Sequence, residues 1–303
     1  MAGKPSRALV LYCNGLARFI GPSHYHLHSL ASKASCGFLT LPSAPPYESE
    51  DDRVVREFAV LMDACEAYTD QLHSNTKMPT ISERFMGMKA VIITKNSSLK
   101  VFGAKLGLTV LESNDLVKNL HSLAEVPADV VASELLNLLG FKEGKTLETS
   151  EYDLVCVHVG DGGRVSGEKN KAVAKDMEYV NSLVGDIMKI AQPGSEIGSR
   201  LHLSLMMSYG HVPEDDDPNL SVLTTKDEKK SDLLMLFPRQ SYTMRGENQR
   251  QDVRHHFPML IAQWQYGVTR KYMTKHGGNL AIPADRFIHE VAFKLWKAPN
   301  YGA

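Results

Sequence analysis

The chain has 303 residues, with 34 Lys and Arg against 35 Asp and Glu, so its formal net charge at pH 7 is −1. This balance gives no general attraction to nucleic acid or to an anionic membrane, and we expect neither as a partner. The four cysteines are widely spaced and form no C-x-x-C pair, which argues against a disulfide framework and against a zinc ribbon. The N-terminal residues lack a signal-type pattern, so a cytoplasmic protein is expected.

Apolar runs alternate with stretches of helical periodicity along the chain. The runs predict strands at Arg7–Cys13, Cys36–Leu41, Met88–Thr94, Leu108–Glu112, Leu154–Val159, Leu201–Met207, Leu233–Phe237 and Met259–Ile261. The periodic stretches predict helices at Ser23–Lys33, Asp52–Leu72, around Val101–Leu106, and at Val126–Leu139, Glu168–Ala191 and Arg286–Trp296. This alternation predicts an α/β fold with a mostly parallel central sheet and helices on both faces.

We expect residues 1–303 to form a single α/β domain. Residues 43–86 could form a small helical insertion within it. Charge and proline gather at 213–231, and this segment is predicted to be an exposed, mobile loop.

Polar residues follow several of the predicted strands. Asn14 ends the first strand, Asp161 lies in a Gly-Asp-Gly-Gly segment after Val159, and His211 follows the strand that ends at Met207. Ligands in open α/β sheets bind beyond the carboxyl ends of the strands, so these positions are candidates for a site. Asp161 could equally form a turn or cap the next helix, and no Walker-type phosphate loop follows it.

Three histidines gather in the segment 23–28. On a helix His24 and His28 share one face at i and i+4, a spacing that metal-binding helices use. Ser23 suits the N-cap position of the same helix and is also a candidate nucleophile. His158, inside an apolar strand, fits a hydrogen-bonded core histidine better than a ligand.

A cationic cluster of Arg254, His255 and His256 lies near Arg245 and Arg250. These side chains could bind a phosphate or a carboxylate, because arginine presents a planar fork of donors. They could equally pair with the acidic residues at 214–217, and the spacing does not decide between the two.

The order of several segments resembles the alkaline phosphatase superfamily, and within it the archaeal type of cofactor-independent phosphoglycerate mutase. The segments that carry the resemblance are Asn14-Gly15-Leu16, the helix at 27–31, the two segments 88–94 and 106–112, and the strand 152–159 before a long helix. In this family two divalent metals, of the Mn, Zn or Mg class, activate a Thr or Ser nucleophile and draw charge from the phosphoryl group. The resemblance places metal ligands at Asn14, Asp161 and His211 and the nucleophile at Ser23 or His24.

The chain departs from the family pattern at most of these chemical positions. Asn14 stands where the family has an aspartate, and an amide is a poorer ligand for a divalent cation than a carboxylate. His24 falls at the nucleophile position, with Ser23 one place away, and His28 replaces a helix aspartate. His211 is kept, but its acidic partner is lost. The resemblance thus implies that the chain keeps the family fold but has lost the metal-dependent chemistry.

We favour a protein that has lost metal-dependent phosphoryl transfer and acts in binding or interaction, with an unknown protein or a small phosphorylated molecule as its partner. One alternative is a divergent phosphohydrolase or phosphomutase that uses Ser23 or His24 with Asp161 and His211. The other is an anion-binding module built on Arg254, His255 and His256.

Overall fold

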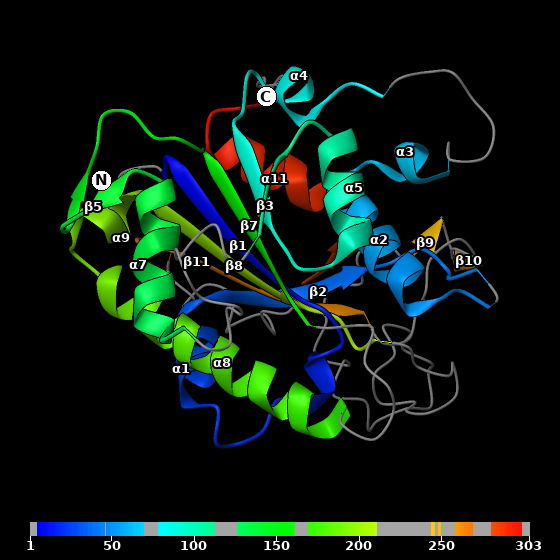
Figure 1. Cartoon of the computed structure of the whole chain (residues 1–303), viewed down its shortest axis with the longest axis horizontal. Helices are drawn as coiled ribbons and strands as arrows, with labels where there is room; N and C mark the ends of the chain where they lie inside the picture. The colour runs from blue at the N-terminus through cyan, green and yellow to red at the C-terminus, as the bar shows by residue number, and fades with distance from the viewer. Residues whose placement is uncertain are drawn as a thin grey trace.

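The computed structural model describes residues 5–45, 47–69, 78–112, 126–160, 169–210, 244–245, 248–249, 258–268 and 280–298. An eight-stranded sheet crosses the middle of the molecule, in the order β12-β2-β11-β8-β1-β7-β3-β4 (Figure 1). The strands are β1 Arg7–Cys13, β2 Ser35–Thr40, β3 Ala90–Ile93, β4 Thr109–Leu111, β7 Leu154–Val159, β8 Leu201–Met207, β11 Met259–Gln265 and β12 Leu280–Pro283. The predicted mostly parallel sheet is confirmed.

Five neighbouring strands, β8, β1, β7, β3 and β4, run parallel to one another, whereas β11 runs antiparallel to both β8 and β2. In the central strand β1, Tyr12 lies beside His158 of β7 and Met206 of β8. All residues of β7 and β8 are buried, as expected of strands that helices cover on both faces. Because β1, β7 and β8 run parallel, their carboxyl ends meet at one edge of the sheet.

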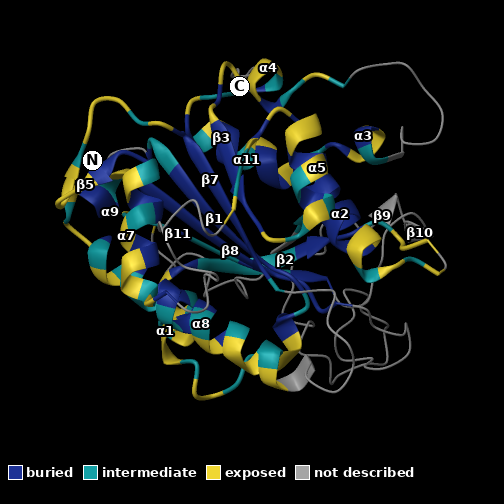
Figure 2. Cartoon of the chain, in the orientation of Figure 1, coloured by how far each residue is buried: buried dark blue, intermediate teal, exposed yellow. Residues whose placement is uncertain are grey.

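Helices form a layer on each face of the sheet (Figures 1 and 2). One core cluster packs β1 residues such as Leu9 and Leu11 against α1 Tyr25–Lys33, α7 Ala128–Leu138 and α8 Lys169–Ile190. The other packs Val10 and Tyr12 against α2 Glu50–Leu61, α5 Ser97–Lys105 and α11 Arg286–Lys294. Alternate side chains of one strand thus enter opposite cores.

Short elements complete the described chain. They are η1 Ala17–Phe19, α3 Cys65–Thr69, α4 Ile81–Arg84, α9 Glu196–Arg200 and the strands β5 Phe141–Lys142, β6 Lys145–Thr146, β9 Met244–Arg245 and β10 Asn248–Gln249. The sequence patterns did not predict these, nor β12, because two to five residues are too few to establish a period. Within the described chain, each helix is too short or too polar to span a membrane.

The predicted helix Asp52–Leu72 is wrong at its C-terminal end, because α2 stops at Leu61. Asp63 adopts a left-handed conformation with φ +47°. The N–H groups of Asp63 and Ala64 donate to the carbonyls of Val60 and Ala59, which is the Schellman arrangement with aspartate in place of the usual glycine. Arg84 donates to the Met62 carbonyl and pairs with Asp63 at 3.0 Å, so tertiary contacts stabilise this helix end.

Other segments predicted from the sequence can be compared with the observed elements. The strand expected at Met259–Ile261 continues to Gln265. In the region considered as an insertion, α2 packs into the second core cluster, and the division into domains stays a prediction. The expected strand at 233–237 and the loop at 213–231 lie outside the described residues.

The two cysteines expected to be core thiols, in β1 and β7, lie in the core. Cys13 and Cys156 are buried, and burial raises the pKa of each thiol. Neither thiol is therefore ionised near neutral pH, and neither is a candidate nucleophile.

Polar groups are buried at the amino end of β8. The His202 ring is fully buried, and its Nε2 lies 3.1 Å from Ser204 Oγ. Its Nδ1 has no hydrogen-bond partner among the described residues. Burial, and secondly the charge of Lys294 on α11, lower the pKa of His202 well below its ordinary value. Glu290, four residues before Lys294 on the same helix, faces the same region and offsets part of the lysine charge.

We predict that His202 makes the protein less stable as the pH falls. In the unfolded chain this histidine takes up a proton at about pH 6.5, whereas in the folded chain it stays neutral to lower pH. The free energy of unfolding should therefore fall below about pH 6.5, by up to about 1.4 kcal/mol per pH unit from this group. Urea unfolding at pH 7.5, 6.5 and 5.5 measures the slope.

His202→Leu should show a smaller loss of stability on acidification than the wild type. Leu135→Ala, which removes a buried side chain without a titratable group, is the matched control and should keep the wild-type slope. Equal slopes for His202→Leu and the wild type would contradict the prediction.

Candidate site at the carboxyl ends of the central strands

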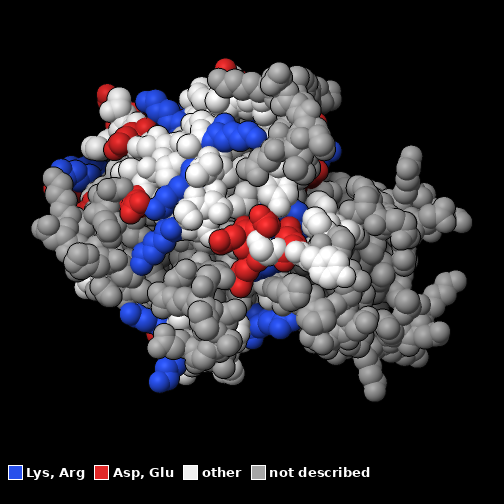
Figure 3. Space-filling view, turned by 45° about the vertical axis from the view of Figure 1, so that its right-hand side comes forward, with Lys and Arg blue, Asp and Glu red and all other residues white. Residues whose placement is uncertain are grey.

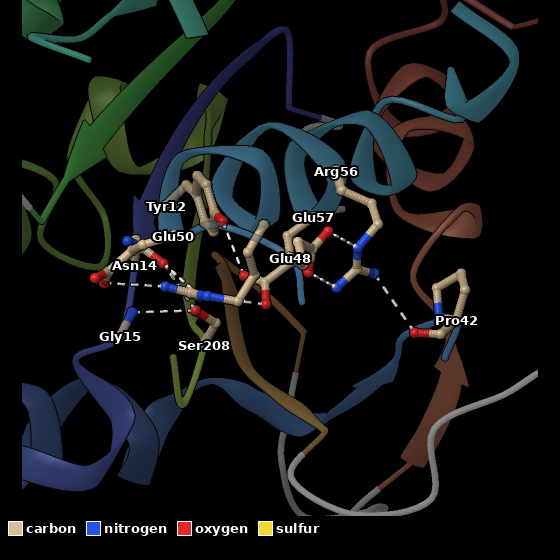
Figure 4. A network of polar contacts seen from close by, with 10 residues as sticks. Tyr12, Asn14, Gly15, Pro42, Glu48, Glu50, Arg56, Glu57 and Ser208 are labelled. Carbon is tan, nitrogen blue, oxygen red and sulfur yellow. Dashed lines mark hydrogen bonds and ion pairs between the residues drawn. The ribbon is translucent and has the colours of Figure 1, made fainter. Parts of the chain in front are cut away.

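The ends of β1, β7 and β8 come together around Asn14. The Asn14 N–H donates to the carbonyl of Val159 at the end of β7. From the end of β8, Ser208 donates through Oγ to Asn14 Oδ1 at 3.3 Å and accepts the Gly15 N–H at 3.1 Å (Figure 4). The side chains of Asn14 and Ser208 are both buried. The polar residue predicted at the end of β1 thus lies at the meeting point of three strands.

Glycines permit this close approach of the strand ends. Gly160 has φ +120°, and a Cβ atom there would lie 2.6 Å from the backbone oxygen of Asn14. Gly210 has φ +78°, and a Cβ atom there would lie 3.3 Å from the Cα of Gly15. Both positions need a residue without a side chain.

A buried arginine from α2 reaches Asn14. Arg53 is 3% exposed, and its Nη1 donates to Asn14 Oδ1 at 2.9 Å. The same Nη1 lies 3.5 Å from Glu57 Oε1, and Nη2 donates to Glu50 Oε1 at 3.2 Å. Three oxygens, one amide and two carboxylate, therefore surround one guanidinium group.

The Glu57 carboxylate is 0% exposed and depends on its partners for charge compensation. Besides Arg53, it accepts a 3.0 Å hydrogen bond from the Tyr12 hydroxyl in the central strand (Figure 4). Burial and then the Glu57 charge raise the pKa of Tyr12 well above its usual value. The hydroxyl therefore keeps its proton and donates a hydrogen bond to Glu57.

A second arginine fixes the segment before α2. Arg56 pairs with Glu48 through two contacts, Nε to Oε1 at 2.5 Å and Nη2 to Oε2 at 3.0 Å, and Nη1 lies 3.5 Å from the Pro42 carbonyl (Figure 4). Two parallel contacts of this kind are the strong geometry of an arginine and carboxylate pair. Glu48 is thus engaged and does not compete for Arg53.

The residues at Asn14 do not fit the divalent metals that the family resemblance implies. The Asn14 oxygen already accepts hydrogen bonds from Arg53 and Ser208. A divalent cation about 4 Å from the guanidinium charge would be repelled by about 8 kcal/mol at an effective dielectric constant of about 20. No group of three or more His, Cys, Asp or Glu side chains able to hold a metal occurs within the ranges that the structure describes.

Ser23 and His24 lie at the start of α1, where the sequence placed them. His24, not Ser23, is the N-cap residue and makes no side-chain capping bond, so the N-cap prediction for Ser23 is wrong. The Gly21 N–H donates to His24 Nδ1 at 2.8 Å, and His28 Nε2 lies 3.0 Å from the Gly21 carbonyl. Both imidazoles therefore contact the backbone of Gly21, and in the described structure no hydrogen bond joins them to Asn14.

The N-terminal N–H groups of α1 are satisfied from α8. His26 and Leu27 donate their backbone N–H groups to Asn181 Oδ1 at 3.0 and 3.3 Å. Asn181 is 5% exposed. An amide oxygen thus takes the place where the N-terminus of a helix could otherwise hold an anion.

Other candidates fall outside the described residues: Asp161, His211, Arg254, His255 and His256. His158 is buried, and its Nδ1 lies 3.0 Å from Oγ1 of Thr94, the residue after β3, so the expected core histidine is confirmed. The sequence reasoning missed Arg53, Glu57 and Ser208. The signal for the first two was an Arg and a Glu at i and i+4 inside an otherwise apolar helix face.

Comparison with solved structures identifies the fold. The lipoteichoic acid synthase LtaP of Listeria monocytogenes superposes with a TM-score of 0.55 at 10% identity, covering 99% of this chain and 74% of its own. An alkaline phosphatase superfamily protein of Vibrio parahaemolyticus gives 0.52 at 10% identity, covering 97% and 67%. The chain has the alkaline phosphatase fold.

The protein PH0037 of Pyrococcus horikoshii also matches, with a TM-score of 0.51 at 10% identity over the whole of both chains. A scan of family models and a search of curated proteins give no match. The expected superfamily fold is therefore confirmed from structure alone, and the finer likeness to phosphoglycerate mutases stays a prediction.

We predict that Gly160→Ala will lower the free energy of unfolding by about 3 kcal/mol. The added Cβ meets the Asn14 carbonyl oxygen, and φ +120° is itself unfavourable for alanine. Gly144→Ala is the matched control, because Gly144 also has positive φ but its added Cβ would meet no atom within 4 Å. It should cost only about 1 kcal/mol. Urea unfolding compares the two, and equal losses would show that the strand ends are not closely packed here.

Proposed function

We propose that this protein is a binding or interaction protein on an alkaline phosphatase fold, and that it does not carry out metal-dependent phosphoryl transfer. The observation that carries the proposal is the hydrogen bond from the buried Arg53 to Asn14 at the end of β1. Where the family resemblance implies a metal-binding carboxylate, this chain places an amide against a protein cation.

The acidic groups near the strand ends support the proposal. A two-metal site needs several anionic ligands to offset about four positive charges. Glu50 and Glu57 both pair with Arg53, the residue that donates to Asn14. Arg53 therefore neutralises much of the negative charge that a metal ion would need.

The geometry of His24 weighs against the alternative of a surviving enzyme that uses this residue as its nucleophile. Because Nδ1 accepts the Gly21 N–H, the neutral ring carries its proton on Nε2. A protonated ring nitrogen has no lone pair with which to attack phosphorus or bind a metal. Ser23 is exposed, and in the described ranges no histidine or carboxylate hydrogen bonds to its hydroxyl.

The start of α1 gives further support. Asn181 already accepts the N–H groups of His26 and Leu27, so a phosphoryl group would have to displace a buried amide. A phosphorylated molecule or a protein partner is therefore expected to be bound without being turned over.

The proposal predicts no metal-dependent phosphatase turnover. Purified full-length protein should be assayed with p-nitrophenyl phosphate and 3-phosphoglycerate in the presence of Mn²⁺, Zn²⁺ or Mg²⁺, and its metal content measured by mass spectrometry. We expect rates at the level of buffer and less than one metal ion per chain.

Asp161→Ala tests the acid that the family resemblance assigns to a metal. Asp129→Ala, at an exposed position of α7, is its matched control. Metal-dependent turnover that is lost in Asp161→Ala and kept in Asp129→Ala would refute the proposal.

A further inference from the structure

We infer that Arg53 is the resident cation of a three-oxygen site formed by Asn14, Glu50 and Glu57, and that this site is specific for a guanidinium group. This deepens the proposed function and rests on it only in that both deny a divalent metal at Asn14. The inference concerns what fills the site, and its test does not use catalysis.

The contacts fit the two terminal nitrogens of a guanidinium in direction, whereas the buried Nε of Arg53 has no hydrogen-bond partner among the described residues. Nη1 faces Asn14 Oδ1 and Glu57 Oε1, and Nη2 faces Glu50 Oε1. Arginine presents its donors in a fixed planar fork, whereas an ammonium group is a compact point charge. The two nitrogens reach acceptors on a strand end and on both sides of Arg53 in α2, so the plane of the group is held by two elements.

Burial makes the cation necessary. The Glu57 side chain is 0% exposed, and its other hydrogen-bond donor, Tyr12, is neutral. A buried carboxylate that loses its cationic partner destabilises a protein strongly. The positive charge of Arg53 therefore lies in the folded core, where it compensates the charge of Glu57.

The surroundings select a cation over an anion. The first turn of α2 carries Glu50, Asp51 and Asp52, and acidic side chains form a group on the face that Figure 3 turns forward, the side on which Figure 1 shows α2. A phosphate or carboxylate near Arg53 would meet these charges. The electrostatic potential of these acidic side chains favours a positively charged group in the three-oxygen site.

The outer end of the site, at Glu50, is partly exposed. The Glu50 side chain is 39% exposed, whereas that of Glu57 is fully buried. If Arg53 is shortened to alanine, a small cation can enter past Glu50 and reach Glu57. This arrangement permits a chemical rescue experiment.

The test is the thermal unfolding of full-length Arg53→Ala with and without methylguanidinium chloride. We expect the substitution to lower Tm by about 8 °C, from the loss of a buried ion-pair partner. Methylguanidinium at millimolar concentration should restore about 3 °C or more. Methylammonium chloride at the same concentration should restore less than half as much, because its compact charge lacks the planar fork of donors.

Three controls locate the effect. Arg53→Ala/Glu57→Gln removes the buried charge, so it should melt above Arg53→Ala and show no response to methylguanidinium. Arg84→Ala removes an arginine whose carboxylate partner, Asp63, is 44% exposed, so it leaves no buried charge and should show no such rescue. The wild type should not respond either.

An absent rescue in Arg53→Ala, or an equal one in Arg84→Ala, would overturn the inference. So would a rise in wild-type Tm with Mn²⁺, Zn²⁺ or Mg²⁺ that Asn14→Ala abolishes. If Arg53→Ala does not fold, the double variant decides, because only a charge-driven defect is repaired by Glu57→Gln. If the protein showed metal-dependent phosphatase turnover but the rescue experiments came out as expected, the proposed function would be refuted and the inference about Arg53 would stand.

Discussion

The buried pairing of Arg53 with Glu57 is the constraint on which the candidate site depends. It ties the helix α2 to the end of the central strand through Asn14, and to the strand itself through Tyr12. Neither charge could be buried alone without a large desolvation cost. The position of α2 over the sheet and the polarity of the strand ends are therefore coupled.

The rest of the strand-end geometry follows from the parallel sheet. Parallel strands bring their carboxyl ends to one edge, and the absence of side chains at Gly160 and Gly210 lets neighbouring backbones approach. Ser208 then bridges Asn14 and Gly15. This packing leaves polar side chains close together in the interior, where each needs a partner. The fold thus creates a polar site, and the identity of the residues decides its chemistry.

Much of the fold could be predicted from the sequence. The central strands are long apolar runs, and the helices α7 and α8 show clear periodicity, because burial on a sheet face dictates both patterns. The end of α2 could not be predicted, since the apolar period continues beyond Leu61 and the helix is stopped by the conformation of Asp63 and by contacts from Arg84, 21 residues away. Tertiary contacts override local propensity there.

The candidate site was predicted only in part. Asn14 was found because a polar residue at a strand end is visible in the sequence. Arg53 was missed because its partners come from a strand 39 residues earlier and from its own helix, and only the fold brings them together. Ser208 was missed for a similar reason, since its contact to Asn14 joins residues 194 positions apart.

A cation that belongs to the polypeptide differs from a bound metal in its supply. The charge of Arg53 is present as soon as the chain is made, does not depend on the cell's pool of trace elements, and cannot be stripped by a chelator. A core that contains this cation at the end of β1 therefore keeps its charge balance without drawing on the metal ions of the cell.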